Sequence, residues 1–102
     1  MAEEDRFFQH FGDLEGSVYA DGAINGKMTE LMGLAISITM QCDECVMYHL
    51  RRCVDLKIDR TQILESIRVA VMTGGSLTFP QARLAFRLLD GSRRSTDDTK
   101  SE

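Results

Sequence analysis

Two cysteines and a histidine lie close together near the middle of this 102-residue chain. Cys42 and Cys45 are three residues apart, and His49 follows four residues after Cys45. Two thiols at this spacing, at the start of a helix, can close a small disulfide ring with little backbone movement. An imidazole one helical turn beyond a thiol can accept its proton, directly or through water. The pattern therefore indicates a dithiol redox site, with metal binding as the other use of these side chains.

A zinc site would recruit Cys53 as a fourth ligand to the same series. Tetrahedral zinc holds its ligands at about 2.0–2.3 Å from the ion. Cys42 and Cys53 are separated by roughly 16 Å along a straight helix, so one helix cannot bring all four ligands to one ion. We therefore expect no resident metal here, although two or three of the ligands could bind one with outside help. Cys53 itself is expected to be a small buried apolar residue.

Glu30 is the carboxylate that could act on His49. It lies near the start of an apolar helical segment, where it could also simply stabilise the helix N-terminus. If the chain forms an antiparallel hairpin that turns near Gln41, Glu30 and His49 are offset by only roughly 4–5 Å along the helix axis. Cys45 is offset from Glu30 by about 10 Å on the same count. The spacing predicts a proton relay from carboxylate to imidazole to thiol.

The elements that must position these side chains are expected to be helices. Apolar residues recur at helical spacing, and no convincing strand-like alternation occurs. We predict an all-α bundle of about five helices, the fourth beginning after Asp59 and ending at Gly74-Gly75. The other four cover residues 4–18, 27–40, 42–56 and 78–90. The second of them has almost no polar face and should be buried nearly all round. Residues 1–91 form the domain, and residues 92–102 are expected to be a disordered tail.

Composition and charge limit the partners and the compartment. A net charge of −4 argues against a nucleic-acid partner. The acidic N-terminus lacks the features of an export signal, and no apolar stretch approaches the roughly 20 residues that span a bilayer. We therefore expect a cytoplasmic protein without a membrane partner, in which a close cysteine pair is more often catalytic or metal-binding than structural. The apolar load of residues 27–40, with Phe7, Phe8 and Phe11, predicts a homo-oligomer.

Four residues at fixed spacing resemble the E-x11-C-x2-C-x3-H signature of alkylhydroperoxidase D-like proteins, which belong to the carboxymuconolactone decarboxylase superfamily: Glu30, Cys42, Cys45 and His49. Residues 21–27 and 63–75 resemble the flanking segments of that family, so the likeness covers about residues 20–90. Two positions depart from the family pattern. Glu44 stands where well-known peroxidase members have a histidine, and Lys57 stands where the family usually has a helix-ending glycine.

The resemblance implies an all-helical fold that assembles as a homotrimer or homohexamer. It also implies a peroxidase without a cofactor, in which Cys45 reacts with peroxide, Cys42 resolves the product to a disulfide, and His49 and Glu30 relay the proton. The partners would be a peroxide or another small-molecule substrate and a reducing thiol. Two alternatives stay open: a carboxymuconolactone decarboxylase-like enzyme acting on a small organic acid, and a metal-binding or structural helical oligomer.

Overall fold

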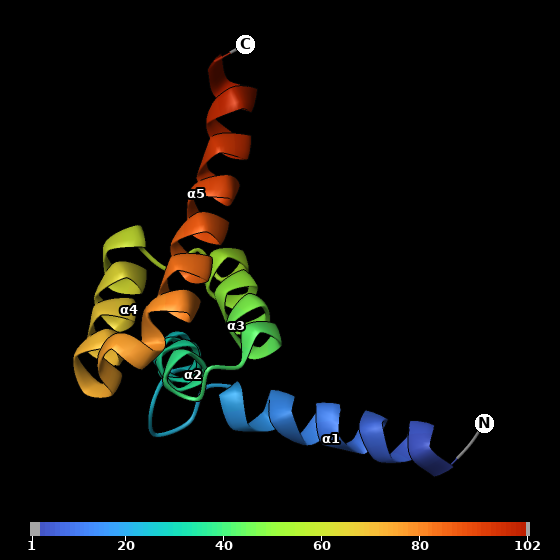
Figure 1. Cartoon of the computed structure of the whole chain (residues 1–102). Helices are drawn as coiled ribbons and strands as arrows, with labels where there is room; N and C mark the ends of the chain where they lie inside the picture. Colours follow the sequence, from blue (N-terminus) through green and yellow to red (C-terminus); the bar gives the residue numbers. More distant parts are fainter. Residues whose placement is uncertain (1–2, 102) are drawn as a thin grey trace.

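The computed structural model describes the backbone of residues 3–101 and the side chains of residues 4–91. Every regular element in that range is helical: α1 (Glu3–Tyr19), α2 (Gly26–Thr39), α3 (Asp43–Asp55), α4 (Arg60–Gly74), the 3-10 helix η1 (Gly75–Thr78) and α5 (Phe79–Ser101). Figure 1 shows α2, α3, α4 and the first part of α5 packed together, while α1 extends away from them. The predicted all-helical fold with five α-helices is confirmed, and η1 is an addition that the sequence did not predict.

The core lies where α2, α3, α4 and α5 meet. One apolar face of each helix supplies it, and its buried residues are Leu34, Ile38, Val46, Leu50, Cys53, Ile58, Ile63, Ile67, Ala70, Ala82, Ala85 and Leu89. The burial of this surface is the main favourable term in the folding of such a bundle. The core therefore holds α2 and α3 side by side, which fixes the relative height of the side chains on their facing surfaces.

Two tight turns set the ends of α3. Gln41 has a φ of 59°, and this left-handed conformation reverses the chain between α2 and α3. Lys57 has a φ of 58° just after α3, at the position where glycine most often closes a helix. The hairpin considered from the sequence, turning near Gln41, is present, and Lys57 has the left-handed conformation at the position where the family usually has a glycine.

The prediction that the second helix is buried nearly all round is wrong for the single chain. Four apolar side chains at four-residue intervals, along α2 and at its C-cap, are 44–72 % exposed: Met28, Met32, Ile36 and Met40. The physical reason is that α2 packs mainly against α3 and α4, and these contacts leave this stripe exposed in the described part of the chain. Helix α2 is therefore a core element with one uncovered apolar face.

Helix α1 has the predicted apolar stripe, but the stripe does not pack on the bundle. Its five large apolar side chains are 57–67 % exposed: Phe7, Phe8, Phe11, Leu14 and Val18. Figure 1 shows the N-terminal part of α1 projecting from the bundle as an arm, with its C-terminal end beside α2. The chain therefore presents two exposed apolar stripes, one on α1 and one on α2.

The last helix is longer than the sequence predicted. We expected it to end at Asp90, but α5 continues through Gly91 to Ser101. A single glycine costs a helix only about 1 kcal/mol relative to alanine, and no proline follows Pro80 to stop it. The backbone of residues 92–101 is thus helical rather than irregular, and the view that this tail is dispensable stays a prediction. No helix of the described chain is both long and apolar enough to cross a membrane.

Candidate active site

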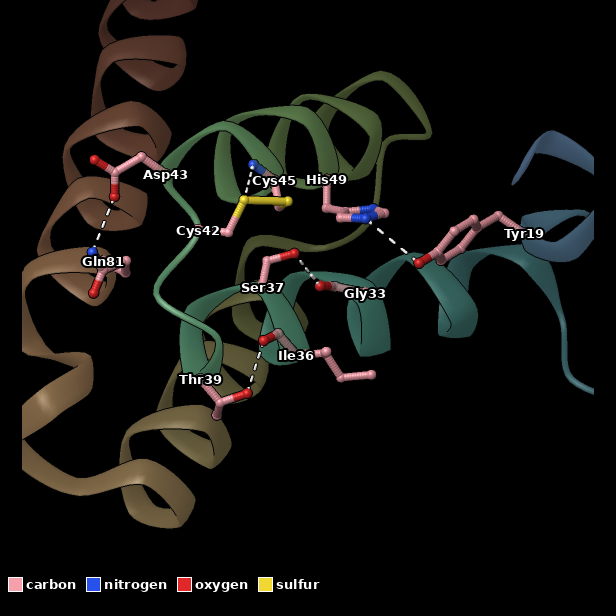
Figure 2. Close-up of a disulfide and its surroundings, with 10 residues drawn as sticks. All are labelled: Tyr19, Gly33, Ile36, Ser37, Thr39, Cys42, Asp43, Cys45, His49 and Gln81. Atoms are coloured by element: carbon pink, nitrogen blue, oxygen red, sulfur yellow. Dashed lines mark hydrogen bonds between the residues drawn. A yellow bond between two sulfur atoms is a disulfide. The ribbon is translucent and has the colours of Figure 1, made fainter. Parts of the chain in front are cut away.

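The two cysteines of the C-x2-C pair are joined by a disulfide at the start of α3. Cys42 is the N-cap residue, and its Sγ accepts a hydrogen bond from the backbone N–H of Cys45 at 3.3 Å. The Cα atoms are 5.3 Å apart, within the usual range for a disulfide. Figure 2 shows this disulfide and its neighbours. Cys45 is exposed and Cys42 is half-buried. The α3 N-terminus thus supplies a pair of sulfur atoms that can be oxidised together and of which one is open to solvent.

Glu30 and His49 meet between α2 and α3, as the hairpin arithmetic predicted. Nδ1 of His49 lies 2.9 Å from Oε1 of Glu30, and both residues are buried. A carboxylate only accepts hydrogen bonds, so this contact places the imidazole hydrogen on Nδ1. The neutral imidazole then presents a lone pair at Nε2. Glu30 therefore acts on His49 through a direct hydrogen bond and not merely as a charge at a helix N-terminus.

Arg52, on α3, also forms an ion pair with the Glu30 carboxylate. Its Nε donates to Oε2 of Glu30 at 3.3 Å. A buried carboxylate is costly unless it is paired and hydrogen-bonded, and the guanidinium supplies both a donor and a positive charge. The Arg52 side chain remains 42 % exposed, so it reaches Glu30 from the surface. Each carboxylate oxygen of Glu30 thus accepts one hydrogen bond, from His49 or from Arg52.

Two tyrosine rings surround the imidazole of His49. The Tyr19 ring, from the end of α1, lies 4.9 Å from it between centroids, and its hydroxyl is 3.5 Å from Nε2. The Tyr48 ring packs edge-on at 5.0 Å. Figure 2 shows the imidazole directed toward Tyr19 rather than toward the disulfide. Among the described residues, no hydrogen bond joins His49 to either sulfur in this oxidised state.

Gly33 makes room for this arrangement on α2. A Cβ at Gly33 would lie 2.9 Å from both Nδ1 and Cε1 of His49 and 3.0 Å from a ring carbon of Tyr19. The His49 ring could not move aside without breaking its hydrogen bond to Glu30. The absence of a side chain at this position therefore lets the imidazole lie directly against the α2 backbone.

The third cysteine is separate from the reactive pair. Cys53 is a free thiol with no exposed surface, packed in the core as predicted. Burial, with a smaller contribution from the charge of Glu30, raises the pKa of the Cys53 thiol to about 12. Because the folded state holds this proton more tightly than the unfolded chain, the resulting stability is complete below pH 9 and is lost as the pH rises toward about 12. At neutral pH, Cys53 is therefore an unreactive thiol.

The surface hollow and the second histidine are separate from this site. A hollow of about 420 Å³ lies between α3 and α5, bordered by Tyr48, Leu50 and Leu88 but not by Cys45 or His49. Within the described part of the chain, no three histidine, cysteine or acidic side chains are grouped so that they could hold a metal ion. The other histidine, His10, is exposed on α1.

The structure pairs Cys42 with Cys45 and Glu30 with His49, on the facing helices of the α2–α3 hairpin. Three neighbours of His49 and Glu30 were not predicted. Tyr19 was not singled out, because it precedes a loop of six residues whose path cannot be derived from periodicity. Arg52 was not singled out either, because helical periodicity assigns its position to the outward face of α3. Gly33 had a signal that could have been used: it lies three residues after Glu30, on the same helical face, where a glycine can mark a close approach.

Comparisons with known proteins agree with this fold. A profile described as the carboxymuconolactone decarboxylase family matches residues 5–90. An uncharacterized protein of Cupriavidus necator is 27 % identical over 55 residues, which are 54 % of this chain and 49 % of that protein. Uncharacterized protein 4 of the cox locus of Paracoccus denitrificans is 29 % identical over 73 residues, 72 % of this chain and 66 % of that protein. The chain thus spans about half of the first relative and about two thirds of the second.

Solved structures match over more of their length. A carboxymuconolactone decarboxylase family protein from Thermotoga maritima has a TM-score of 0.82 and 35 % identity, covering 89 % of this chain and 94 % of its own. It is described as a candidate for involvement in an antioxidative response. The apo form of a family member from Legionella pneumophila has a TM-score of 0.80 and 28 % identity, covering 87 % of this chain and 80 % of its own.

Proposed function

This chain belongs to the carboxymuconolactone decarboxylase family, and we propose that within it the protein is a thiol-dependent peroxidase or disulfide oxidoreductase. The observation that carries the proposal is the disulfide of Cys42 and Cys45, one helical turn from an imidazole that a buried carboxylate orients. The description of the Thermotoga maritima protein also supports an antioxidative role. A thiol, a base and an orienting group in this order are the usual parts of an activated nucleophile.

In the proposed reaction, the exposed Cys45 is the nucleophile. The reduced Cys45 thiol gives its proton to His49, and the thiolate attacks one oxygen of a hydroperoxide. The S–O bond forms as the O–O bond breaks, the leaving oxygen takes up the proton as an alcohol or water, and Cys45 becomes a sulfenic acid. The thiol of Cys42 then attacks the Cys45 sulfur, which forms the disulfide and releases water.

Two electrons must then return from outside the chain. A reducing thiol partner attacks the disulfide, and a second thiol releases the mixed disulfide, so that Cys42 and Cys45 are thiols again. We place this cycle in the cytoplasm, where thiol reductants are maintained. Glu30 and Arg52 take no part in bond making. They keep the hydrogen of His49 on Nδ1, so that Nε2 is the nitrogen that accepts the proton.

Thiol titration tests the proposed oxidation. Fully reduced protein has three thiols per chain, and mild treatment with hydrogen peroxide or an alkyl hydroperoxide should remove two of them. The third, Cys53, should survive because its buried thiol has a pKa of about 12 and so forms almost no thiolate at neutral pH. Titration after unfolding, with mass mapping of the remaining thiol, measures both results. Retention of all three thiols, or loss of Cys53 before the pair, would contradict the proposal.

We also propose that the protein is a homotrimer or homohexamer. The exposed stripes of α1 and α2 are the support, since contiguous exposed apolar surface on a protein this small commonly marks an interaction site. Sedimentation velocity should show a stable oligomer at micromolar concentration. Phe11→Glu, in the middle of the α1 stripe, should weaken it, whereas Glu65→Gln on the exposed surface of α4 should leave it unchanged. A wild-type chain that sediments as a monomer would rule this assembly out.

A further inference from the structure

The proposed relay leaves one atom of His49 without an assigned partner. Nδ1 already carries the hydrogen that it shares with Glu30, so a proton from Cys45 has to arrive at Nε2. The side-chain group that meets Nε2 is the hydroxyl of Tyr19, at 3.5 Å. Tyr19 belongs to α1, the helix that otherwise extends away from the bundle, as Figure 1 shows. The role of this tyrosine is therefore a question separate from the identity of the nucleophile.

We propose that Tyr19 is a positioning residue of the relay, whose hydroxyl holds the Nε2 edge of His49 at the place where the proton arrives. Glu30, His49 and Tyr19 then form one hydrogen-bonded series that runs from α2 through α3 to α1. The effect on catalysis rests on the proposed peroxidase function, whereas the contact itself can be tested in protein that is not turning over.

Backbone contacts around Tyr19 fix the position of its side chain beside His49. The carbonyl of Tyr19 accepts a hydrogen bond from the hydroxyl of Thr29 at 3.1 Å. Gly26 approaches the same carbonyl so closely that a Cβ there would lie 2.9 Å from it. The N–H of Gly26 donates to the carboxylate of Asp21 at 2.6 Å, which ties the loop after α1 to the first turn of α2. These contacts fix the end of α1 over Gly33, beside the imidazole.

The chemistry of a phenol suits both states of the imidazole. With neutral His49, the Tyr19 hydroxyl donates to the lone pair of Nε2. Burial, with the charge of Glu30, raises the pKa of this hydroxyl, so it keeps the hydrogen that it donates. The hydroxyl hydrogen turns away as Nε2 takes the proton from Cys45, and the same oxygen then accepts a hydrogen bond from Nε2–H, because a hydroxyl is both donor and acceptor. A contact of 3.5 Å is long, but catalytic hydrogen bonds often shorten only when the site is engaged.

Tyr48 provides a comparison within the same site. Its ring packs edge-on against the same imidazole at 5.0 Å, yet no hydrogen bond joins its hydroxyl to His49. If the tyrosines only enclosed the imidazole with apolar surface, removing either hydroxyl would have little effect. If Tyr19 positions Nε2, only the hydroxyl of Tyr19 matters. Tyr19→Phe and Tyr48→Phe are thus a matched pair that retains both rings.

Nitrogen NMR of the oxidised protein tests the contact directly. The chain has two histidines, and His10→Gln on exposed α1 leaves the signals of His49 alone. In this background, Tyr19→Phe should move the ¹⁵N resonance of Nε2 toward that of an imine nitrogen without a hydrogen bond, while Tyr48→Phe should leave it in place. An unmoved Nε2 resonance in Tyr19→Phe, or an equal displacement in Tyr48→Phe, would overturn the proposal.

The effect of Tyr19 on catalysis is tested by the rate at which excess peroxide oxidises Cys45. Tyr19→Phe should slow this single-turnover step by about fivefold, the usual effect of losing one neutral hydrogen bond, and Tyr48→Phe should remain close to wild type. An unchanged rate in a Tyr19→Phe protein whose Nε2 resonance has moved would overturn the positioning role. A wild-type protein that does not react with peroxide would instead overturn the proposed function, and the NMR result would still decide the contact.

Discussion

Replacing Cys45 with serine is expected to reduce peroxide turnover by roughly three orders of magnitude or more, the scale of loss when a catalytic nucleophile is removed. A serine hydroxyl is far less nucleophilic than a thiol and cannot form a sulfenic acid or a disulfide. Cys45 is exposed, so serine at this position should not disturb the core. The measurement is peroxide consumption with a dithiol reductant in excess.

Cys53→Ala is the matched control for that variant. It removes a thiol that is buried in the core and not part of the pair. Its peroxide turnover should stay within about twofold of wild type, while its stability falls modestly because a small cavity replaces the sulfur. Retained turnover in Cys45→Ser, or an equal loss in Cys53→Ala, would mean that the nucleophile has been wrongly assigned.

Replacing Glu30 with glutamine should lower the rate of Cys45 oxidation by about a hundredfold, within the range that positioned acid–base groups contribute. The amide keeps the shape of the carboxylate but has one acceptor oxygen, so its NH2 group must face the donor of either His49 or Arg52. In either orientation His49 loses the charged acceptor that holds its hydrogen on Nδ1 and that stabilises the imidazolium. The same mismatch should reduce the free energy of unfolding by about 1–3 kcal/mol, which chemical denaturation measures.

The Glu30→Gln variant should still fold, because the side chain of Arg52 is partly exposed. Because the Arg52 guanidinium can swing into solvent, the fold should survive the loss of the buried charge. Glu65→Gln, on the exposed surface of α4, is the matched control and should match wild type in rate and stability. A Glu30→Gln protein that reacts with peroxide at the wild-type rate would show that the carboxylate has no part in proton transfer.

The meeting of Glu30 and His49 could be predicted because it depends only on helical geometry. Once the chain reverses at Gln41, the rise per residue fixes which positions on α2 and α3 lie at the same height. The left-handed residue after α3, at Lys57, was likewise predictable, since a helix without a closing glycine still has to end. These are local rules applied to a short hairpin.

The contacts of Tyr19 and Arg52 could not be predicted in the same way. Tyr19 reaches His49 across a loop whose path depends on particular hydrogen bonds at Asp21 and Thr29, not on a period. Arg52 is on the polar side of α3, but its long side chain curls back to a buried charge. The apolar surface of residues 27–40 was predicted, but the location of its exposed stripe was not, because composition predicts burial without saying which molecule provides the cover.

Trapping of the sulfenic acid in Cys42→Ser tests the account most directly. Without the resolving thiol, the oxidised sulfur of Cys45 should persist after one equivalent of peroxide and react with a sulfenic-acid probe such as dimedone. Peptide mass spectrometry should then place the adduct on Cys45, with Cys53 unmodified. An adduct on Cys42 in Cys45→Ser, together with none on Cys45 in Cys42→Ser, would contradict the assignment of Cys45 as the nucleophile.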